Sequence, residues 1–268
     1  MRALIILLLV LSLLGCAKEP IEKEILQSMG RLDSFYIPVL VFSNLQKGRE
    51  TELAMDRFVK QWKKFDQKYS KLQLTYGLDI KDKEWSADFL DLDSSVLLSQ
   101  QFFVEGDLIG MYQQLQKIRQ VLAKIRQRHG WPYFLDNLTL FHESMDQIVI
   151  YLRGKDELTD RDRNKLRELF RAAQSSLLAA ENAELPNEVF GFDEEKVAAI
   201  KKRVREEQRL LAAFAAALSK QNADGIFQTA TELKPNFIVL LKAFGDFQPI
   251  FDQVVKERKN KEEEKNEE

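Results

Sequence analysis

The chain has 268 residues, of which 45% are hydrophobic and 31% charged, a composition typical of folded globular proteins and not of disordered ones. Its 40 basic and 42 acidic residues nearly cancel and are interspersed, so the sequence lacks the electrostatic footprint of a protein that binds nucleic acid or an anionic membrane surface. Glycine (11) and proline (6) are scarce, which favours helices, because strand-rich folds need many turn residues.

The first predicted element is an export signal over residues 1–15. Met1 and Arg2 give it a positive start, and the apolar run at 3–14 has the length of a secretory signal core, too short to span a bilayer as a helix. The run ends in Leu-Leu-Gly-Cys at 13–16, which resembles the lipobox of bacterial lipoprotein signal peptides. This resemblance implies cleavage before Cys16, diacylation of its thiol and a third acyl chain on the new amino terminus, enough for stable anchoring.

The lipobox resemblance also implies where in the cell the protein is located. Ala17 follows the cysteine where an aspartate would resemble an inner-membrane retention signal, so we expect a bacterial outer membrane, with the chain on its periplasmic side. Cys16 is the only cysteine, which excludes an internal disulfide. The alternatives are a plain secretory leader, with a cysteine near the cut by coincidence, or a free structural thiol.

After a tether at 16–22, the segment Phe-Tyr-Ile-Pro-Val-Leu-Val-Phe at 35–42 is apolar on every side and fits either a strand or a buried helix. We favour a helix capped at Asp33 or Ser34, with Pro38 in its first turn, because no partner strand is evident. Apolar residues at helical spacing then predict helices over 49–72, 84–104, 107–127 and 135–152.

Two helices of the second half have predicted caps. Thr159, with Asp162 three residues later, resembles a capping box with a shorter acid, and Asp193 caps a helix over 194–219. A turn at 222–225 precedes a final pair of helices, in which we expect breaks or kinks at Pro235 and Pro249. The tail at 256–268 has no apolar residues, which predicts a frayed helix end or disorder.

These patterns predict an all-α bundle of about eight helices. The sequence divides at His-Gly-Trp-Pro (129–132), and each side has a similar order of helices, so we expect a first unit over 23–130 and a second over 131–255, as two tandem four-helix units. Four aromatic residues are expected to be core and helix-junction anchors, or to line an apolar pocket between helices: Trp62, Trp85, Trp131 and Tyr133.

Only two histidines are available for chemistry, and we interpret His129 as structural, at a helix C-terminus. His142 faces the apolar stripe of its predicted helix and shares that side with Met145 and Asp146, at i+3 and i+4. An imidazole and a thioether in a bundle interior could ligate copper or a b-type haem iron, with the carboxylate orienting the ring. The alternative is a buried neutral histidine bonded to Asp146 or Tyr112, with Met145 filling a gap.

Gln208 is a further candidate site residue. It falls between Val204 and Leu211 near the centre of an apolar stripe, where a buried amide could contact a ligand or satisfy a neighbouring helix.

The chain has no G-x-S-x-G, P-loop, G-x-G-x-x-G or H-E-x-x-H motif. It therefore lacks the motifs that usually carry acyl transfer, nucleotide binding and zinc-dependent proteolysis. We therefore expect a membrane-tethered, non-enzymatic binding or scaffold module without a cofactor, whose partner is a protein or a small molecule. The alternative hypothesis is a metal- or haem-binding bundle that uses His142, Met145 and Asp146.

Overall fold

The computed structural model describes residues 21–76 and 80–267, and within these ranges the protein is all-α, as predicted. Ten helices lie in the described part of the chain, two more than the predicted eight or so; they include α8, a single turn that the sequence pattern did not reveal. The helices are α2 (Ile21–Asn44), α3 (Gly48–Tyr69), α4 (Trp85–Val104), α5 (Leu108–His129), α6 (Phe134–Leu152), α7 (Asp160–Asn182), α8 (Asn187–Phe190), α9 (Glu194–Ser219), α10 (Ala223–Lys242) and α11 (Gln248–Glu267).

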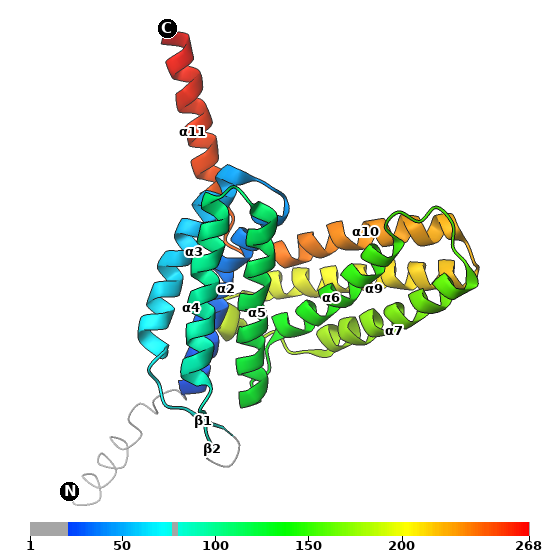
Figure 1. Ribbon diagram of the computed structural model, residues 1–268, viewed down its shortest axis with the longest axis horizontal. Coiled ribbons are helices and arrows are strands. Elements are labelled where there is room, and N and C mark those ends of the chain that lie inside the picture. Colours follow the sequence, from blue (N-terminus) through cyan, green and yellow to red (C-terminus); the bar gives the residue numbers. More distant parts are fainter. Residues whose placement is uncertain (1–20, 77–79, 268) are drawn as a thin grey trace, which may run out of the picture.

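The helices pack in antiparallel pairs that form two groups (Figure 1). Helices α2 to α5 pack on one another and form the first group. Helices α6, α7, α9 and α10 form the second group, which extends sideways from the first. Contacts of α8 and α10 with α2 join the two groups, and the turn between α5 and α6 connects them along the chain.

The connection between α3 and α4 carries the only strand pairing in the described ranges. Strand β1 (Thr75–Tyr76) pairs antiparallel with β2 (Ile80–Lys81). This short hairpin lies at the same end of the first group as the start of α2, whereas α11 projects beyond the opposite end (Figure 1). None of the helices in the described part of the chain is both long and apolar enough to cross a membrane.

Helix α2 confirms the choice of helix over strand for 35–42, but it begins much earlier than predicted. It starts at Ile21, within the predicted tether, and Pro38 lies in its interior and not in its first turn. A proline inside a helix leaves the carbonyl four residues earlier without its usual donor. Here the backbone N–H of Asp246 donates to that carbonyl, on Ser34, at 2.8 Å, so a tertiary hydrogen bond replaces the missing helical one.

The predicted caps of the second half are present. Thr159 and Asp162 form a capping box at the start of α7, and Asp193 caps α9. Of the break or kink predicted at Pro235, the break is wrong, because α10 continues through it. Pro249 is the second residue of α11, where its missing N–H breaks no helical bond. The segment from 256 is helical as far as Glu267, and not disordered.

Each group has an aromatic core on the predicted apolar stripes. In the first group the ring of Phe89, from α4, stacks on Phe65 of α3 at 5.7 Å and on Trp62 at 6.0 Å. In the second group Phe141 of α6 packs against Phe237 of α10 at 5.9 Å. The second group has smaller cavities of about 250 and 240 Å³ beside α7 and α9, and the largest of the described cavities lies between the two groups.

Candidate functional site

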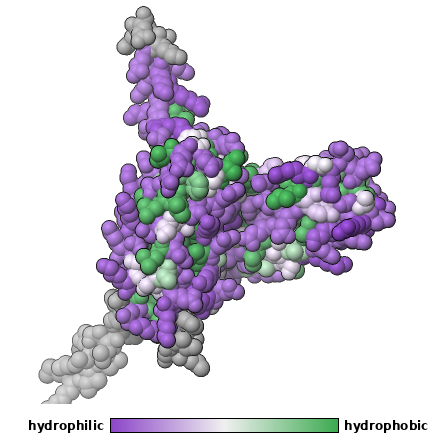
Figure 2. Space-filling model, in the orientation of Figure 1, coloured by the Kyte–Doolittle hydropathy of each residue, from purple (hydrophilic) through white to green (hydrophobic). Residues whose placement is uncertain are grey.

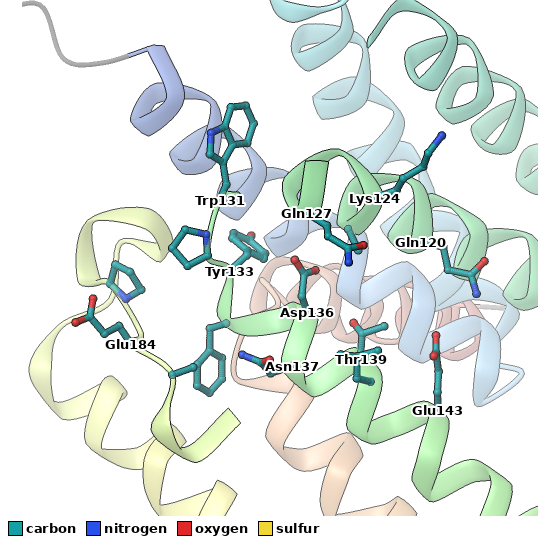
Figure 3. Close-up of a pocket in the computed structure, with 16 residues that line it drawn as sticks. Gln120, Lys124, Gln127, Trp131, Tyr133, Asp136, Asn137, Thr139, Glu143 and Glu184 are labelled. Atoms are coloured by element: carbon teal, nitrogen blue, oxygen red, sulfur yellow. The ribbon is translucent and has the colours of Figure 1, made fainter. Parts of the chain in front are cut away.

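A groove of about 820 Å³ lies where the two groups meet (Figure 3). Its walls come from α5, from the start of α6 with the turn before it, and from the connection between α7 and α8. The α7–α8 connection contributes Ala183, Glu184 and Pro186. A cavity of this size is in the range of ligand sites in proteins, and the junction between two packed bodies is a common place for one. We refer to it as the junction groove.

The α5 wall is a polar stripe. Gln120, Lys124 and Gln127 lie four and three residues apart, which brings them to one face of the helix, and all three are exposed. The ammonium of Lys124 lies 2.8 Å from a carboxylate oxygen of Glu84 and 3.3 Å from one of Asp88. The lysine charge is therefore balanced within the chain, and the two glutamines offer free hydrogen-bonding groups.

The α6 wall combines acidic, amide and apolar side chains. Asp136, Asn137, Leu140 and Glu143 follow one another along the face of α6 that borders the groove, and side chains from both walls converge on the space between the helices (Figure 3). Of the four aromatic residues expected either to be core anchors or to line an inter-helix pocket, Trp131 and Tyr133 line the groove and are mostly buried, whereas Trp62 and Trp85 are buried in the core of the first group.

Asp136 is held in place by a buried arginine behind the groove wall. Arg126 is 2% exposed and donates from Nε and Nη2 to the two carboxylate oxygens of Asp136, at 2.9 and 2.5 Å. Burial by itself lowers the pKa of Arg126, but the hydrogen bonds to Asp136, together with the charge of Asp136 and the nearby Tyr133 and Asp33, raise that pKa above its usual value. The arginine is thus permanently charged, and its two-pronged bond fixes the orientation of the carboxylate.

A second buried bond extends this arrangement into the first group. The Arg126 guanidinium lies over the ring of Tyr133 at 4.1 Å, and the Tyr133 hydroxyl donates to Asp33 of α2 at 2.5 Å. Burial raises the pKa of Asp33 to about 6, although Arg126 and Tyr133 act in the opposite direction. Asp33, Tyr133, Arg126 and Asp136 form a polar layer, which we call the junction layer, between α2, α5 and the start of α6.

The third wall is positioned by α8, which packs against α2 at Gly30. A Cβ atom at Gly30 would lie 2.3 Å from the carbonyl oxygen of Val189, so only glycine permits this approach. The ring of Phe190 packs on Tyr133 at 5.1 Å. The α7–α8 wall of the groove is therefore attached to the junction layer.

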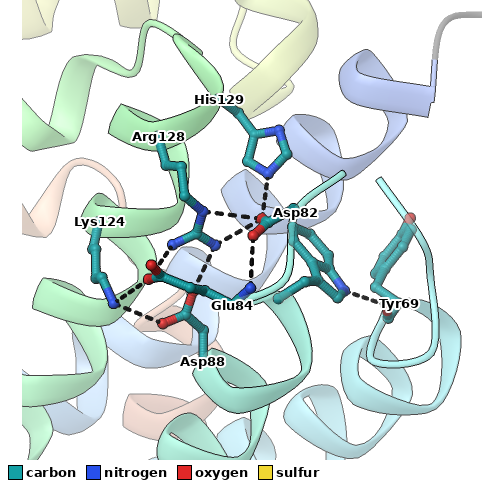
Figure 4. A network of polar contacts seen from close by, with 8 residues as sticks. Tyr69, Asp82, Glu84, Asp88, Lys124, Arg128 and His129 are labelled. Atoms are coloured by element: carbon teal, nitrogen blue, oxygen red, sulfur yellow. Dashed lines mark hydrogen bonds and ion pairs between the residues drawn. The ribbon is translucent and has the colours of Figure 1, made fainter. Parts of the chain in front are cut away.

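A network of charged groups fixes the hairpin end of the molecule beside the groove (Figure 4). Asp82 accepts hydrogen bonds from Nε and Nη2 of Arg128 at 3.0 and 2.8 Å, and its Oδ2 lies 2.7 Å from Nε2 of His129. Burial would raise the pKa of Asp82, but these bonds hold it below its usual value. His129 ends α5, as predicted, and its ring stacks on Trp131 at 4.5 Å.

His142 is brought next to Asp146 but not into an open site. Its Nε2 is 3.4 Å from the carboxylate of Asp146, its ring stacks on Phe237 at 4.9 Å, and Met145 is fully buried. Burial lowers the pKa of His142 to about 4, so the imidazole is neutral near pH 7. Lys234 already supplies a cation 3.2 Å from Asp146, and no group of three or more His, Cys, Asp or Glu in the described ranges could hold a metal ion.

The stripe of α9 differs from the prediction by one residue. Gln208 is half-buried and donates a hydrogen bond to Glu181 of α7, which agrees with the alternative that its amide satisfies a neighbouring helix, and it borders a separate cavity of about 250 Å³ between α7 and α9. The buried polar position belongs to Glu207, which is 0% exposed and has no hydrogen-bond partner on either carboxylate oxygen. Burial raises the pKa of Glu207 to about 8, partly offset by the amide of Asn236 from α10.

Sequence reasoning missed the junction layer, although one signal was present. Arg126 follows Leu122 at i+4 and so extends the apolar stripe of α5 with a charged residue, a pattern that indicates a buried ion pair. Asp136 resembles an ordinary first-turn acid of α6. The candidate lipid-attachment residue, Cys16, lies outside the described residues. Comparisons of the chain with models of known protein families, with curated proteins and with solved structures found no match.

Proposed function

We propose that this chain is a lipid-anchored protein of the bacterial cell envelope, attached through Cys16 to the periplasmic side of the outer membrane, and that it acts as a binding or scaffold module and not as an enzyme. The observation that carries the binding role is the junction groove, an 820 Å³ recess with a fixed frame. Its fixed charges, Asp136 and Lys124, are already neutralised by partners in the chain, so they suit recognition better than proton transfer.

The lining of the junction groove indicates what it binds. Glu143 and Glu184 make the lining net acidic, because the charges of Asp136 and of Lys124, the single basic residue of the lining, are already balanced by partners in the chain. Amides from both helices surround an apolar bed that includes the exposed Leu140. This combination favours a segment of a partner protein that carries basic side chains and backbone groups free to hydrogen-bond.

The position of the groove agrees with attachment near residue 16. The start of α2 and the hairpin lie at one end of the first group (Figure 1), and the network from Asp82 to His129 joins that end to Trp131 in the groove lining. An anchor on Cys16 would hold this end close to the membrane and direct α11 away from it. A partner near the outer membrane would then have access to the groove.

The anchor is tested by growing bacteria that express the full chain with an alkyne-labelled palmitate. Label is expected on the wild-type chain in the membrane fraction, and none on the Cys16→Ser variant. A wild-type chain without label would contradict the lipid anchor, and it would leave the test of the groove unaffected.

The groove is tested with a photo-crosslinking amino acid placed at Gln127 in the full chain, with Lys202, exposed on α9, as the control position. We expect a defined crosslinked partner from position 127 and not from 202, and its loss when Leu140→Arg fills the groove with a long charged side chain. The same products from both positions, or products that Leu140→Arg leaves unchanged, would contradict binding in the groove.

A further inference from the structure

Two further cavities lie in the second group, between α7 and α9. The larger, of about 250 Å³, is bordered by Leu177 and Leu178 of α7 and by Leu211 of α9. The smaller, of about 240 Å³, is bordered by Ala180 of α7 and Val204 of α9. Both cavities therefore have apolar side chains in their walls.

The two cavities form one furrow, because their lining follows a single stripe of each helix. Phe170 borders the larger cavity together with Ala212, whereas Glu181 borders the smaller one together with Lys201, so the two helices run antiparallel along the furrow. The stripe positions are three or four residues apart: Phe170, Gln174, Leu178 and Glu181 on α7, and Lys201, Arg205, Gln208 and Ala212 on α9. The furrow extends over about 16 Å of each helix. We call it the α7–α9 furrow.

The charges of the α7–α9 furrow are confined to one end. Lys201 and Arg205 line the smaller cavity, and neither forms an ion pair within the described part of the chain. Two cations four residues apart on one helix repel each other, and an anion between them would relieve this repulsion. Glu181, the third charged residue of the lining, accepts a hydrogen bond from Gln208. The lining of the larger cavity has no charged residue, so the furrow has a cationic end and an apolar end.

Apolar surface is otherwise dispersed on the second group. In the surface view this group is largely hydrophilic, with small separate hydrophobic patches (Figure 2). A large contiguous apolar patch would indicate a protein partner. A narrow apolar furrow with positive charge at one end instead matches a small amphiphilic anion.

We propose that the α7–α9 furrow binds a single acyl chain with an anionic head group, either a carboxylate or a phosphate monoester. The head group lies between Lys201 and Arg205, where the guanidinium can donate two parallel hydrogen bonds to it. The acyl chain lies along the apolar floor and ends near Ala212. Binding covers Leu178, which is 51% exposed in the ligand-free protein.

Gln208 and Glu181 lie in the middle of the furrow. Their hydrogen bond joins α9 to α7 between the two cavities. Both side chains reach solvent, so the bond opens at little cost. When it opens, Glu181 turns away from the anionic head group and the Gln208 amide is free to donate to it.

A photoreactive fatty acid tests the furrow in the full chain. The cell fraction that contains the chain is washed free of small molecules, incubated with a hexadecanoic acid that carries an alkyne and a diazirine near the end of its chain, and illuminated. We expect crosslinks on residues that border the larger cavity. Dodecanoate and dodecyl phosphate should compete, and the stronger of the two identifies the head group as carboxylate or phosphate. Dodecanol, which has no charge, should compete at least about tenfold more weakly.

The apolar end is tested by Ala212→Trp, which fills the larger cavity from an exposed position. We expect the crosslinking yield to fall at least about tenfold. The matched control is Ala213→Trp, at the next residue of α9, which is also exposed but does not line the furrow. Far-UV circular dichroism checks that both variants keep their helices.

The cationic end is tested by the double variant Lys201→Gln with Arg205→Gln. It should lower the yield about tenfold at low salt and less at high salt, because screening already weakens the attraction there. The matched control is Lys202→Gln with Arg203→Gln, which removes the same charge from exposed positions of α9 outside the lining.

Three results would overturn the proposal, which depends neither on acylation of Cys16 nor on binding in the junction groove. Crosslinks could be spread over other helices without preference for the furrow, or Ala212→Trp could leave the yield unchanged. Dodecanol could also compete as well as the two anions, with equal losses from the two double variants, which would exclude recognition of an anionic head group.

Discussion

Glu207 is expected to make the stability of the protein fall as pH rises. Burial raises its pKa to about 8 in the folded state, whereas the unfolded chain has the ordinary value of 4.5. Below pH 4.5 both states hold the proton. Between pH 4.5 and 8 the unfolded state releases it and the folded state does not, so the free energy of unfolding should decrease by up to about 1.4 kcal/mol per pH unit. Chemical denaturation between pH 5 and 8.5 measures this dependence.

Glu207→Gln removes the titrating group and keeps its size. The variant should resemble the wild type near pH 5 and exceed its stability by about 2 kcal/mol or more at pH 8. Glu206→Gln on the same helix is the control, because Glu206 is more exposed and paired with Arg209, and it should change the pH dependence little. An equal pH dependence for wild type and Glu207→Gln would show that Glu207 is not the cause.

Arg126→Met should destabilise the protein by about 3 kcal/mol. The substitution keeps an apolar side chain of similar length but leaves the carboxylate of Asp136 without its two-pronged partner and removes the cation next to Asp33. Thermal and chemical denaturation measure the loss. Arg171→Met, at an exposed position of α7, should change stability by less than about 0.5 kcal/mol, and a comparable effect of the two substitutions would contradict the role of the junction layer.

Residues could be predicted from the sequence where their burial follows from apolar spacing. His129 at the end of α5 and Thr159 with Asp162 at the start of α7 are where the patterns placed them. The buried polar position of α9 was missed for a specific reason. The buried positions of α9 alternate by four and three residues, which selects Glu207, but Glu206, Glu207 and Gln208 are all polar, so hydrophobicity could not choose between them.

At the scale of elements, the contact between α8 and α2 should depend on Gly30. In Gly30→Ala the new Cβ would lie 2.3 Å from the backbone carbonyl of Val189, so α8 must move. We expect a loss of about 1 to 3 kcal/mol in the free energy of unfolding, measured by chemical denaturation. Gly48→Ala is the matched control, because a Cβ at this first residue of α3 meets no atom within 4 Å and should be neutral or slightly stabilising. A neutral Gly30→Ala would mean that α8 does not depend on this close approach.

The long helices could be predicted because each has one apolar stripe over several turns. Helix α2 and α8 were the exceptions, for different reasons. In α2, Pro38 was interpreted as a signal that a helix begins nearby, but it lies in the helix interior, where a hydrogen bond from Asp246, more than 200 residues away, allows the helix to run through it. Helix α8 is a single turn, too short to show a period, and its position depends on the contact at Gly30.

At the scale of the whole molecule, the sequence predicts the helices but not how the two groups meet. The junction layer joins Arg126 to Asp136 across a turn and Asp33 to Tyr133 across 100 positions of sequence. Such pairings cannot be predicted from periodicity in the sequence, because one charged residue on an otherwise apolar stripe has many candidate partners. The junction groove is a consequence of these contacts, so its lining could be anticipated only at Trp131 and Tyr133.

The shared junction leads us to expect that the two groups unfold together. The three tryptophans, at 62, 85 and 131, report on the first group and the junction, whereas far-UV circular dichroism reports on the helices of both groups. The two signals should give the same denaturant midpoint in the wild type. Leu177→Ala creates a cavity within the second group and should lower stability by about 3 kcal/mol.

If the groups are coupled, Leu177→Ala should shift the tryptophan transition as much as the circular dichroism transition, although no tryptophan lies near it in sequence. Combining Leu177→Ala with Arg126→Met should give the circular dichroism and tryptophan signals different denaturant midpoints, because the second group then unfolds while the first group stays folded. Separate denaturant midpoints in the wild type would contradict this coupling, and so would a Leu177→Ala shift seen only by circular dichroism. Either result would mean that the junction joins two independent folding units, and that the shape of the groove changes whenever their relative orientation changes.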